Sequence, residues 1–509
     1  MVWLIVLGVV VLAVVGVAVY DVLQHHHAVL RNFPVIGHLR YILESFGPET
    51  RQYLVNDNDE ERPFSRDQRR WIYTSSKHRD NTFGFGTDND VEHPEDYLII
   101  KQVAFPLPLA GCSPEPTFEV PAAKVLGGHR GRAKAFRPSV VNFSGMSFGS
   151  LGARAIEAIN LGAQAAGCWQ NTGEGAIAPA HELGADLVWQ IGTGYFGCRD
   201  AHGGFSMSRL VEVVEAHPQL RAIEIKLSQG AKPGIGGMLP GVKVTPEIAA
   251  IRGIPVGVDC HSPASHTAFG GVDSMLDLVE AIAERTGLPV GIKSAVGELD
   301  FWQQLADAID RTGRAVDFVT IDGGEGGTGA APLVFSDHVA LPFRLAFSRV
   351  FRVFAERGID DRIVWIGSGK LGLPENALLA MVLGCDQVSV GREAMMAVGC
   401  IQAQRCHTGR CPTGVATQSP RLQRGLDPTV KAERVANYVG ALRFELVRLA
   451  RACGELHPAL VRPRQLEIIE AGYRSTPVDE LFGYDAGWGE LRPETAEAVR
   501  ALMGAAATG

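Results

Sequence analysis

The segment VDFVTIDGGEGGTG, residues 316–329, joins an apolar run to a cluster of glycines. A short apolar run bounded by glycine is typical of a strand that is buried on both faces, as the strands of parallel sheets are. The glycines after it permit a tight turn or a close approach of the backbone to a ligand. The segment therefore predicts a buried parallel strand with a candidate binding loop at its carboxyl end.

The same pattern recurs in seven other segments of the chain. They are VVNFSGMSFGS (140–150), GCWQNTGEG (167–175), DLVWQIGTGYFG (186–197), RAIEIKLSQGAKPG (221–234), LPVGIKSAVGE (288–298), RIVWIGSGKLG (362–372) and DQVSVGREAM (386–395). Helical stretches separate the runs, and eight such units over roughly 260 residues match the size of a (β/α)8 barrel. A doubly wound open sheet is the second hypothesis, but the G-x-G-x-x-G fingerprint of its first turn is absent. We therefore expect an α/β fold, a TIM barrel whose chemistry lies at the carboxyl ends of its strands.

Polar residues and glycines lie where the predicted strands end. They are Ser147, Glu174, Gln229, Lys232, Lys293, Gly323, Gly324, Ser368 and Arg392. Glycine clusters follow the last three strands, and late loops of this fold often bind phosphate through backbone N–H groups. Arg392 could add a charge-assisted bond. Three consecutive clusters favour phosphate binding over glycines that merely permit tight turns.

Cations at the same mouth suggest further contacts. Lys293 could lie near the pyrimidine ring of a flavin, or it could pair with a carboxylate such as Glu298. The segment 226–252 carries Gln229, Lys232 and Arg252, which suit a small dicarboxylate because arginine binds a carboxylate bidentately and lysine acts as a point charge. The alternative is a solvated basic loop.

Three of the nine cysteines lie within twelve positions, in CIQAQRCHTGRCPTGVATQ (400–418). Cys400, Cys406 and Cys411 are too few for a usual structural zinc site and odd in number for disulfides. Three thiolates on a tight loop suit an iron–sulfur cluster that lacks one iron corner. The remaining cysteines are scattered, as in a reduced, intracellular protein.

The amino-terminal segment Val2–Tyr20 has no charged residue. As a helix it would span about 28 Å, close to the hydrocarbon thickness of a bilayer. A basic leader and a small-residue cleavage site, which mark a signal peptide, are not evident. Arginines follow this segment, which favours a single-pass anchor with the rest of the chain on the cytoplasmic side. The net charge of −8 gives no reason to expect nucleic acid as a partner.

Several of these motifs resemble the FMN-binding synthase domain of the glutamate synthases. They are SGMSFGS, NTGEG, IEIKLSQGAKPGIGGMLPGVKV, DGGEGGTGAAP and the cysteine loop, in that order between about 138 and 450. The resemblance implies a (β/α)8 barrel with FMN and a 3Fe–4S cluster, the latter held by Cys400, Cys406 and Cys411. It places Gln229, Lys232 and Arg252 at the 2-oxoglutarate site, and Glu174, Lys232 and Lys293 at the catalytic centre. The implied FMN contacts are Met146, Ser147, Thr172, Lys293, Gly323, Gly324, Thr328, Ser368, Gly369, Gly391 and Arg392.

The chain departs from the family pattern at two places. The family's K-P-G-E-G-G-Q reads KPGIGGM here, with Ile235 and with Met238 in place of a substrate-contacting amide, and SPPPHHD reads SPASHTA, where only His266 partly matches. No glutaminase region is visible, so ammonia or an amine must come from elsewhere, and electrons from a separate donor protein. An N-alkylglutamate synthase-type reaction, a membrane-tethered electron-transfer protein and an apo scaffold or regulator stay open as alternatives.

The expected organisation has four parts. Residues 1–23 form a transmembrane anchor and residues 24–115 an accessory segment. The barrel covers residues 116–420 and includes the iron–sulfur loop 400–411. Residues 421–509 form a helical extension, in which TVKAERVANYVGALRFELVRLARAC has the spacing of an amphipathic helix that packs on the barrel.

Overall fold

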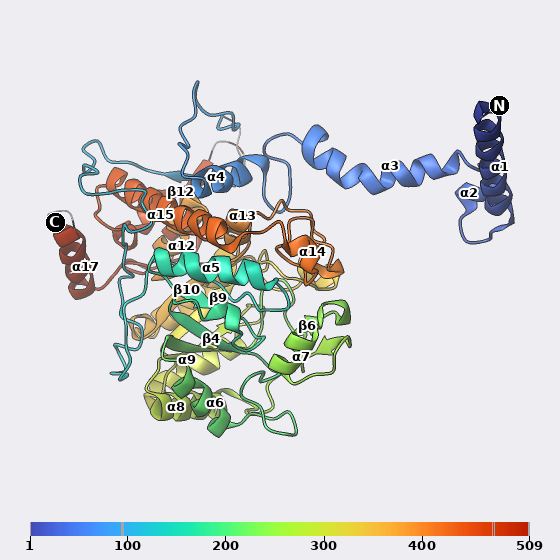
Figure 1. Ribbon diagram of the computed structural model, residues 1–509. Coiled ribbons are helices and arrows are strands. Elements are labelled where there is room, and N and C mark those ends of the chain that lie inside the picture. The colour runs from blue at the N-terminus through green and yellow to red at the C-terminus, as the bar shows by residue number, and fades with distance from the viewer. Residues whose placement is uncertain (1, 93–95, 471, 473, 507–509) are drawn as a thin grey trace. The chain divides into compact units, whose positions relative to one another are not determined.

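The computed structural model describes residues 2–92, 96–470, 472 and 474–506 (Figure 1). The chain divides into two compact units, Met1–Arg69 and Arg70–Gly509. The second unit contains the barrel and every strand and helix that positions the candidate site.

Eight parallel strands close into a barrel in the order β10-β11-β2-β3-β4-β5-β8-β9, which confirms the predicted TIM-barrel fold. The strands are β2 (Val141–Phe143), β3 (Gln170–Asn171), β4 (Leu187–Ile191), β5 (Leu220–Lys226), β8 (Val290–Ser294), β9 (Phe318–Asp322), β10 (Val364–Ser368) and β11 (Gln387–Val390). Each lies inside one of the eight segments singled out from the sequence, apart from the first residue of β5. All five residues of β9 are buried, as expected of a strand covered on both faces.

The barrel interior is partly polar. Glu224 of β5 is buried, and its carboxylate accepts hydrogen bonds from Asn171 Nδ2 (2.8 Å), Gln190 Nε2 (2.7 Å) and Thr320 Oγ1 (2.7 Å). These donors come from β3, β4 and β9. A buried carboxylate is tolerated when it is fully hydrogen-bonded, so this network joins four strands below the mouth.

Helices surround the barrel (Figure 1). In this unit they are α5 (Ala153–Ala165), α6 (Met207–Ala216), α7 (Pro246–Arg252), α8 (Val272–Thr286), α9 (Asp300–Thr312), α10 (Leu333–His338), α11 (Phe343–Ala355), α12 (Pro374–Val382), α13 (Arg392–Val398), α14 (Pro420–Gln423), α15 (Pro428–Ala452), α16 (Val478–Leu481) and α17 (Pro493–Ala506).

Helix α15 packs on the barrel, as its spacing predicted. Its N-cap Asp427 accepts hydrogen bonds from the N–H groups of Thr429 (3.0 Å) and Val430 (3.3 Å), which fixes the start of the helix. It lies beside α5 (Figure 1), where a Cβ on Gly162 would come within 2.6 Å of Val435. Glycine at this position therefore permits the close approach of the two helices.

The carboxyl-terminal region also contains two strands that we did not predict. Strand β12 (Leu466–Glu470) pairs with β13 (Arg474–Pro477) and, on its other side, with β1 (Tyr97–Ile100), all antiparallel. The short run LEIIE carries no period long enough to distinguish strand from helix, and its partner β1 lies far away in the sequence.

The first unit is helical. It contains α1 (Val2–Leu23), α2 (Ala28–Asn32), α3 (Gly37–Thr50), a π-helical turn (Arg51–Val55) and the start of α4 (Arg66–Ser76). Among the described residues, α1 is the one helix long and apolar enough to cross a membrane, and none of its apolar window is buried in the protein.

Candidate active site

An ion pair lies at the mouth of the barrel between the loops that follow β3 and β5. Lys226 is the last residue of β5, and its Nζ lies 2.9 Å from Glu174 Oε1. The same ammonium donates a hydrogen bond to Gln229 Oε1 (2.6 Å). Strand β5 therefore places the Lys226 ammonium at the mouth. This ammonium contacts the Glu174 carboxylate from the loop after β3 and the Gln229 amide oxygen from the loop after β5.

These groups line a cleft with roughly 250 Å³ of empty space. Its lining residues are Glu174, Thr193, Lys226, Leu227, Ser228, Gln229, Lys232, Ile235, Gly236, Gly237 and Ala264. The structure thus brings together three of the residues predicted from the sequence, Glu174, Gln229 and Lys232.

The charges in the cleft shift one another's pKa values. Burial would raise the pKa of Glu174, but the positive charges of Lys226, Lys232 and Arg252 lower it to about 2. Burial lowers the pKa of Lys232, Glu174 opposes this shift and the charges of Lys226 and Arg252 add to it, so that the pKa is about 8. The cleft therefore holds a carboxylate at neutral pH beside an amine that titrates close to it.

Two glycines leave room for the Glu174 carboxylate. A Cβ on Gly192 or on Gly237 would lie 2.6 Å from one of its oxygens. A side chain at either position would displace the carboxylate or the loop, so the site requires glycine at both.

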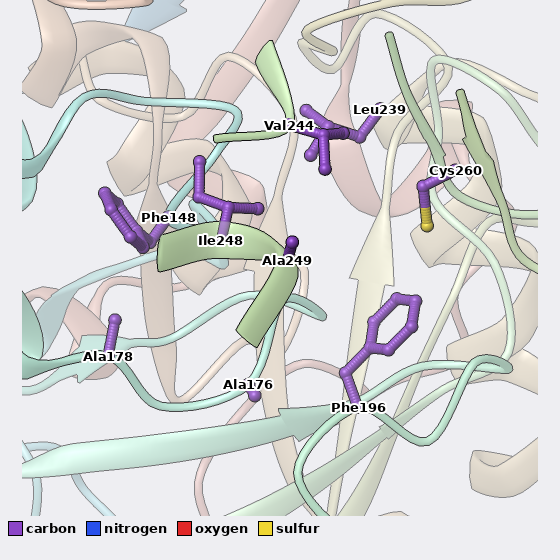
Figure 2. Packing of buried hydrophobic residues seen from close by; sticks show 9 residues of the cluster. All are labelled: Phe148, Ala176, Ala178, Phe196, Leu239, Val244, Ile248, Ala249 and Cys260. Carbon is purple, nitrogen blue, oxygen red and sulfur yellow. The ribbon is translucent and has the colours of Figure 1, made fainter. Parts of the chain in front are cut away.

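Arg252 lies behind this cleft rather than in its lining. It ends α7, whose N-cap Thr245 accepts a hydrogen bond from Ile248 N–H (3.3 Å). The guanidinium is buried, donates to the Phe148 carbonyl (2.9 Å) and lies 5.3 Å from the centre of the Phe196 ring. Both phenylalanines belong to the apolar cluster shown in Figure 2, which packs around α7. Arg252 therefore acts on the cleft through its charge.

The departures from the family pattern occupy different places. Ile235 lines the cleft and puts an apolar side chain in it. Met238 lies in β6 (Met238–Leu239), which pairs with β7 (Cys260–His261), and it is 39% exposed and outside the lining. His266 is buried, and its ring bonds the Lys226 carbonyl (2.9 Å) and the Tyr195 hydroxyl (3.0 Å).

A second group of polar side chains lies at the ends of β2, β8, β9 and β10. Lys293 Nζ lies 3.5 Å from Asp322 Oδ2 and donates to Ser144 Oγ (3.3 Å). The Ser144 and Ser368 hydroxyl oxygens are 3.4 Å apart. Lys293 therefore pairs with a carboxylate, as one of the two hypotheses held, and this carboxylate belongs to Asp322 and not to Glu298. This donor-rich set of groups suits an anionic, hydrogen-bonding cofactor such as FMN.

The late glycine loops pack against one another. A Cβ on Gly369 would lie 3.0 Å from the Gly323 nitrogen, and a Cβ on Gly230 would overlap the Gly323 carbonyl at 1.7 Å. Arg392 donates to the Glu325 carbonyl and so links the loops after β9 and β11. Close loop packing thus accounts for part of the glycine pattern, and phosphate binding here stays a prediction.

The other expected cofactor contacts lie on nearby loops. Met146 is buried and Ser147 partly buried in the loop after β2, and a Cβ on Gly173 would lie 2.6 Å from the Ser147 nitrogen. The Thr172 hydroxyl donates to the Gly173 carbonyl (3.0 Å). Three further residues lie on the late loops, namely Gly324, Thr328 and Gly391, the last of which precedes α13.

The cysteine loop is less organised than the cleft. Cys400 and Cys406 are half-buried and Cys411 is buried, and no disulfide joins them. Burial would raise the pKa of Cys411, but hydrogen bonds from Ala416, Thr413 and Val415 lower it. In residues 2–92, 96–470, 472 and 474–506, no group of three or more His, Cys, Asp or Glu side chains is arranged to hold a metal. The iron–sulfur ligands therefore stay a prediction.

A buried lysine lies beside two of these cysteines. Lys243 Nζ donates to the carbonyls of Ser150 (2.6 Å) and Cys406 (3.2 Å). Burial and the Cys411 charge raise the pKa of Cys406, and the charge of Lys243 opposes this shift. The donor chemistry of this part of the loop fits an anionic thiolate cluster.

Sequence reasoning missed three charged residues that organise the mouth. Lys226 and Asp322 are the last residues of β5 and β9, and Glu224 lies two positions before Lys226. A charged residue that ends a continuous apolar strand was a usable signal, since strand ends carry the chemistry of this fold. Glu224 gave no such signal, because its burial depends on donors from three other strands.

Comparison with known proteins gives one family for this region. Residues 133–455 match a family model described as a conserved region in glutamate synthase. A glutamate synthase large subunit-like protein, YerD from Bacillus subtilis (strain 168), is 38% identical over 467 residues, covering 85% of this chain and 88% of that protein. An archaeal glutamate synthase (NADPH) from Methanocaldococcus jannaschii is 39% identical over 312 residues, covering 61% of this chain and 58% of that protein.

Among solved structures, the recombinant flavin-binding domain of baker's yeast flavocytochrome b2 aligns with a TM-score of 0.42 and 13% identity. The alignment covers 82% of this chain and 84% of that one. No argument below depends on this likeness.

Proposed function

The chain belongs to the glutamate synthase family and is an oxidoreductase of that type, and from this premise we propose that it reductively aminates a 2-oxo acid with ammonia. The expected acid is 2-oxoglutarate. The observation that carries the proposal is the cleft in which Lys226, Lys232 and Glu174 converge at the barrel mouth.

The two lysines would bind the acid. Lys226 is held by β5 and Lys232 by the loop that follows it, so two cations from one segment face the same space. A dicarboxylate would compensate the cost of burying both ammonium groups. Holding the acid in attack geometry is a positioning effect that can contribute several kcal/mol to catalysis.

Proton transfer would depend on Lys232, and Glu174 would act as a fixed negative charge. Condensation of the oxo acid with ammonia gives an imine and water, and the imine then takes up a hydride and a proton. With a pKa of about 2, Glu174 stays a carboxylate at neutral pH and would stabilise the positive charge that develops on the attacking nitrogen. Lys232, with a pKa of about 8, can donate one near neutral pH. We therefore assign the donor role to Lys232 in place of Glu174.

The cofactors would be FMN and a 3Fe–4S cluster. When bound, FMN supplies the hydride and the cluster admits single electrons, which a separate donor protein must provide. Lys293, Ser144 and Ser368 would contact the flavin, and Arg392 with the late glycine loops its phosphate. Cys400, Cys406 and Cys411 would ligate the cluster, a proposal supported by their spacing and by the environment of Cys411.

A second candidate reaction uses an alkylamine in place of ammonia and yields an N-alkylglutamate. Ile235 favours it, because this side chain, like Leu227 and Ala264, adds an apolar group to the lining of the cleft. An alkyl group could pack against Ile235 where ammonia could not.

Single-turnover reoxidation tests both reactions. Full-length protein, purified without oxygen and reduced chemically, is mixed with 2-oxoglutarate and ammonium, with either alone, or with 2-oxoglutarate and methylamine. We expect rapid flavin reoxidation with both substrates together and none with either alone. Failure with every 2-oxo acid would leave a membrane-tethered electron-transfer protein as the better reading.

A substitution of the cleft lysine identifies the binding group. Lys232→Ala should raise the KM for 2-oxoglutarate steeply, because it removes a cation that faces the cleft. Lys134→Ala is the matched control, since Lys134 is an exposed lysine outside the cleft lining. An unchanged KM in Lys232→Ala would exclude the loop as a carboxylate-binding element.

A further inference from the structure

Helix α3 in the first unit carries an apolar stripe that no other part of that unit covers. Leu39, Ile42, Leu43 and Phe46 are 57%, 52%, 63% and 62% exposed. Their spacing of three, four and seven residues places them on one face of the helix. Exposed apolar stripes of this kind mark surfaces that bind a partner or a membrane.

The opposite face of α3 is polar. Arg40 Nε donates to Glu44 Oε1 (2.7 Å), and both side chains are more than half exposed. Ser45 also lies away from the stripe. A helix divided in this way, with aromatic and aliphatic groups on one side and charges on the other, has the pattern of a helix that lies in a membrane interface.

A hydrogen-bonded junction fastens the start of α3 to the end of α1. Asp21 is fully buried although α1 is otherwise exposed, and its carboxylate accepts hydrogen bonds from Val35 N–H (2.9 Å) and from His38 Nε2 (2.9 Å). Helix α2 contacts both α1 and α3. The Asp21 contacts and α2 therefore join α1 and α3 into one structural element.

The charge of the connecting segment suits a lipid surface. Between Asp21 and Glu44 the sequence has no acidic residue, and its formally charged residues are Arg31 and Arg40. His25, His26, His27 and His38 lie in the same stretch. Cations next to a membrane-spanning helix are attracted to anionic headgroups.

We propose that α3 lies in the interface of the bilayer that α1 spans, with Leu39, Ile42, Leu43 and Phe46 in the acyl region and the Arg40–Glu44 face in water. The Asp21 junction holds α3 at that level. This proposal concerns the first unit alone and does not depend on the reaction proposed above.

Photo-crosslinking to lipid tests the proposal directly. Full-length protein is reconstituted in nanodiscs of phosphatidylcholine and phosphatidylglycerol that contain a diazirine-labelled phospholipid, irradiated, and mapped by mass spectrometry. We expect lipid adducts on α1 and on the stripe of α3, and few on Arg40, Glu44 or Ser45. Adducts on α1 alone, or on neither helix, would overturn the proposal.

A matched pair of variants separates lipid from a second copy of the chain. The double variant Leu39→Gln/Leu43→Gln should lower adduct yield at Phe46 severalfold and leave α1 labelled, whereas Ser45→Gln should change neither. If α3 instead covers the stripe of a second copy, the wild-type stripe stays unlabelled and light scattering shows a dimer that the double variant dissociates. That result would overturn the lipid assignment.

Discussion

The substrate cleft and the cysteine loop lie in the same unit but differ in how far the fold alone assembles them. In the cleft, Lys226 is fixed by β5, and its ammonium already contacts Glu174 at 2.9 Å. In the loop, Cys406 lies in a single 3-10 turn and Cys400 in irregular backbone, and both are half-buried. The described residues contain no ready-made metal site there.

The difference shows which functional groups need their ligand in order to be organised. Groups at the ends of barrel strands inherit their positions from the backbone hydrogen bonds of the sheet. Thiols on an irregular loop have no such support, and ligation by a metal cluster commonly supplies the free energy that orders them. We therefore expect the cleft to keep its geometry without substrate and the loop to depend on its cluster.

The largest expected effect is loss of the cluster. Cys406→Ser removes one of three proposed ligands, so bound iron should fall to background while FMN remains bound at the barrel mouth. Iron analysis together with flavin absorbance of oxygen-protected, full-length protein measures both. Since we expect the cluster to order the loop, amide exchange in residues 400–418 should also accelerate.

Cys112→Ser serves as the control for this variant. Cys112 is a free, partly exposed thiol outside the loop, so its replacement should leave iron unchanged. Wild-type iron content in Cys406→Ser would refute the ligand assignment and with it the contrast between the two regions.

The next largest effect is expected in the cleft. Lys226→Met removes the partner of Glu174 and keeps most of the side-chain volume. If Lys226 binds a carboxylate of 2-oxoglutarate, loss of this charge-assisted contact should cost about 3 kcal/mol of binding free energy. This corresponds to a roughly 100-fold weaker affinity for 2-oxoglutarate. Titration calorimetry with the oxo acid alone measures this change without turnover.

The double variant Glu174→Gln/Lys226→Met distinguishes binding from folding. If the single variant weakens affinity only because an unpaired carboxylate disturbs the cleft, the second substitution should restore most of it. If Lys226 binds the substrate itself, affinity stays low. Unchanged affinity in Lys226→Met would mean that the preformed cation has no part in binding.

The sequence predicted the barrel well because its strands are buried on both faces, so that each reads as an apolar run with glycine after it. It predicted that Glu174, Gln229 and Lys232 lie at one mouth, because the ends of the strands converge in this fold. The resemblance puts Met238 in place of a substrate-contacting amide, and in the structure Met238 lies in the β6–β7 pair, outside the lining of the cleft. The β6–β7 pairing joins residues more than twenty positions apart in the sequence, so no local sequence pattern predicts it.

Electrostatics could not be obtained from the sequence at all. The positive charges of Lys226, Lys232 and Arg252 lower the pKa of Glu174 against the effect of burial, which favours Lys232 over Glu174 as the proton donor. A motif names the acid, but only the folded chain shows which cations face it and therefore in which direction its pKa moves.

A pH titration of substrate binding gives a smaller but more specific test. Burial lowers the pKa of Lys232 to about 8, so its charge is present below that pH and is lost above it. Affinity for the oxo-acid dianion should therefore be level near neutral pH and weaken as pH rises above about 8. Lys232→Arg should bring back a level profile to higher pH, because arginine stays charged.

Calorimetry without ammonia keeps the ionisation of the second substrate out of this measurement. Lys134→Ala should reproduce the wild-type pH profile, since that exposed lysine does not line the cleft. A wild-type profile that stays level above pH 9 would show that Lys232 carries no charge important for binding.

The smallest expected effect concerns the loop that contains His266. Hydrogen bonds, and not a strand of the barrel, hold this loop against the cleft. The Lys226 carbonyl can only accept, so His266 Nε2 donates to it, and His266 Nδ1 accepts from the Tyr195 hydroxyl. The Tyr195 oxygen in turn accepts from the N–H groups of Thr267 and Ala268, each at 3.0 Å. This chain requires neutral His266, in agreement with burial, which lowers its pKa.

Replacing His266 separates its hydrogen bond from its volume. His266→Leu leaves a buried carbonyl without its donor, which should lower the free energy of unfolding by about 1–3 kcal/mol, whereas His266→Gln retains a donor and should recover part of that loss. Thermal unfolding measures stability, and titration calorimetry measures any shift of Lys226 in the cleft. Because β5 and not this loop fixes Lys226, 2-oxoglutarate affinity in His266→Leu should fall less than tenfold. A loss of affinity in His266→Leu as large as the loss in Lys226→Met would show that β5 does not preorganise the cleft. The order of the cleft would then come from contacts outside the sheet, as we expect for the cysteine loop.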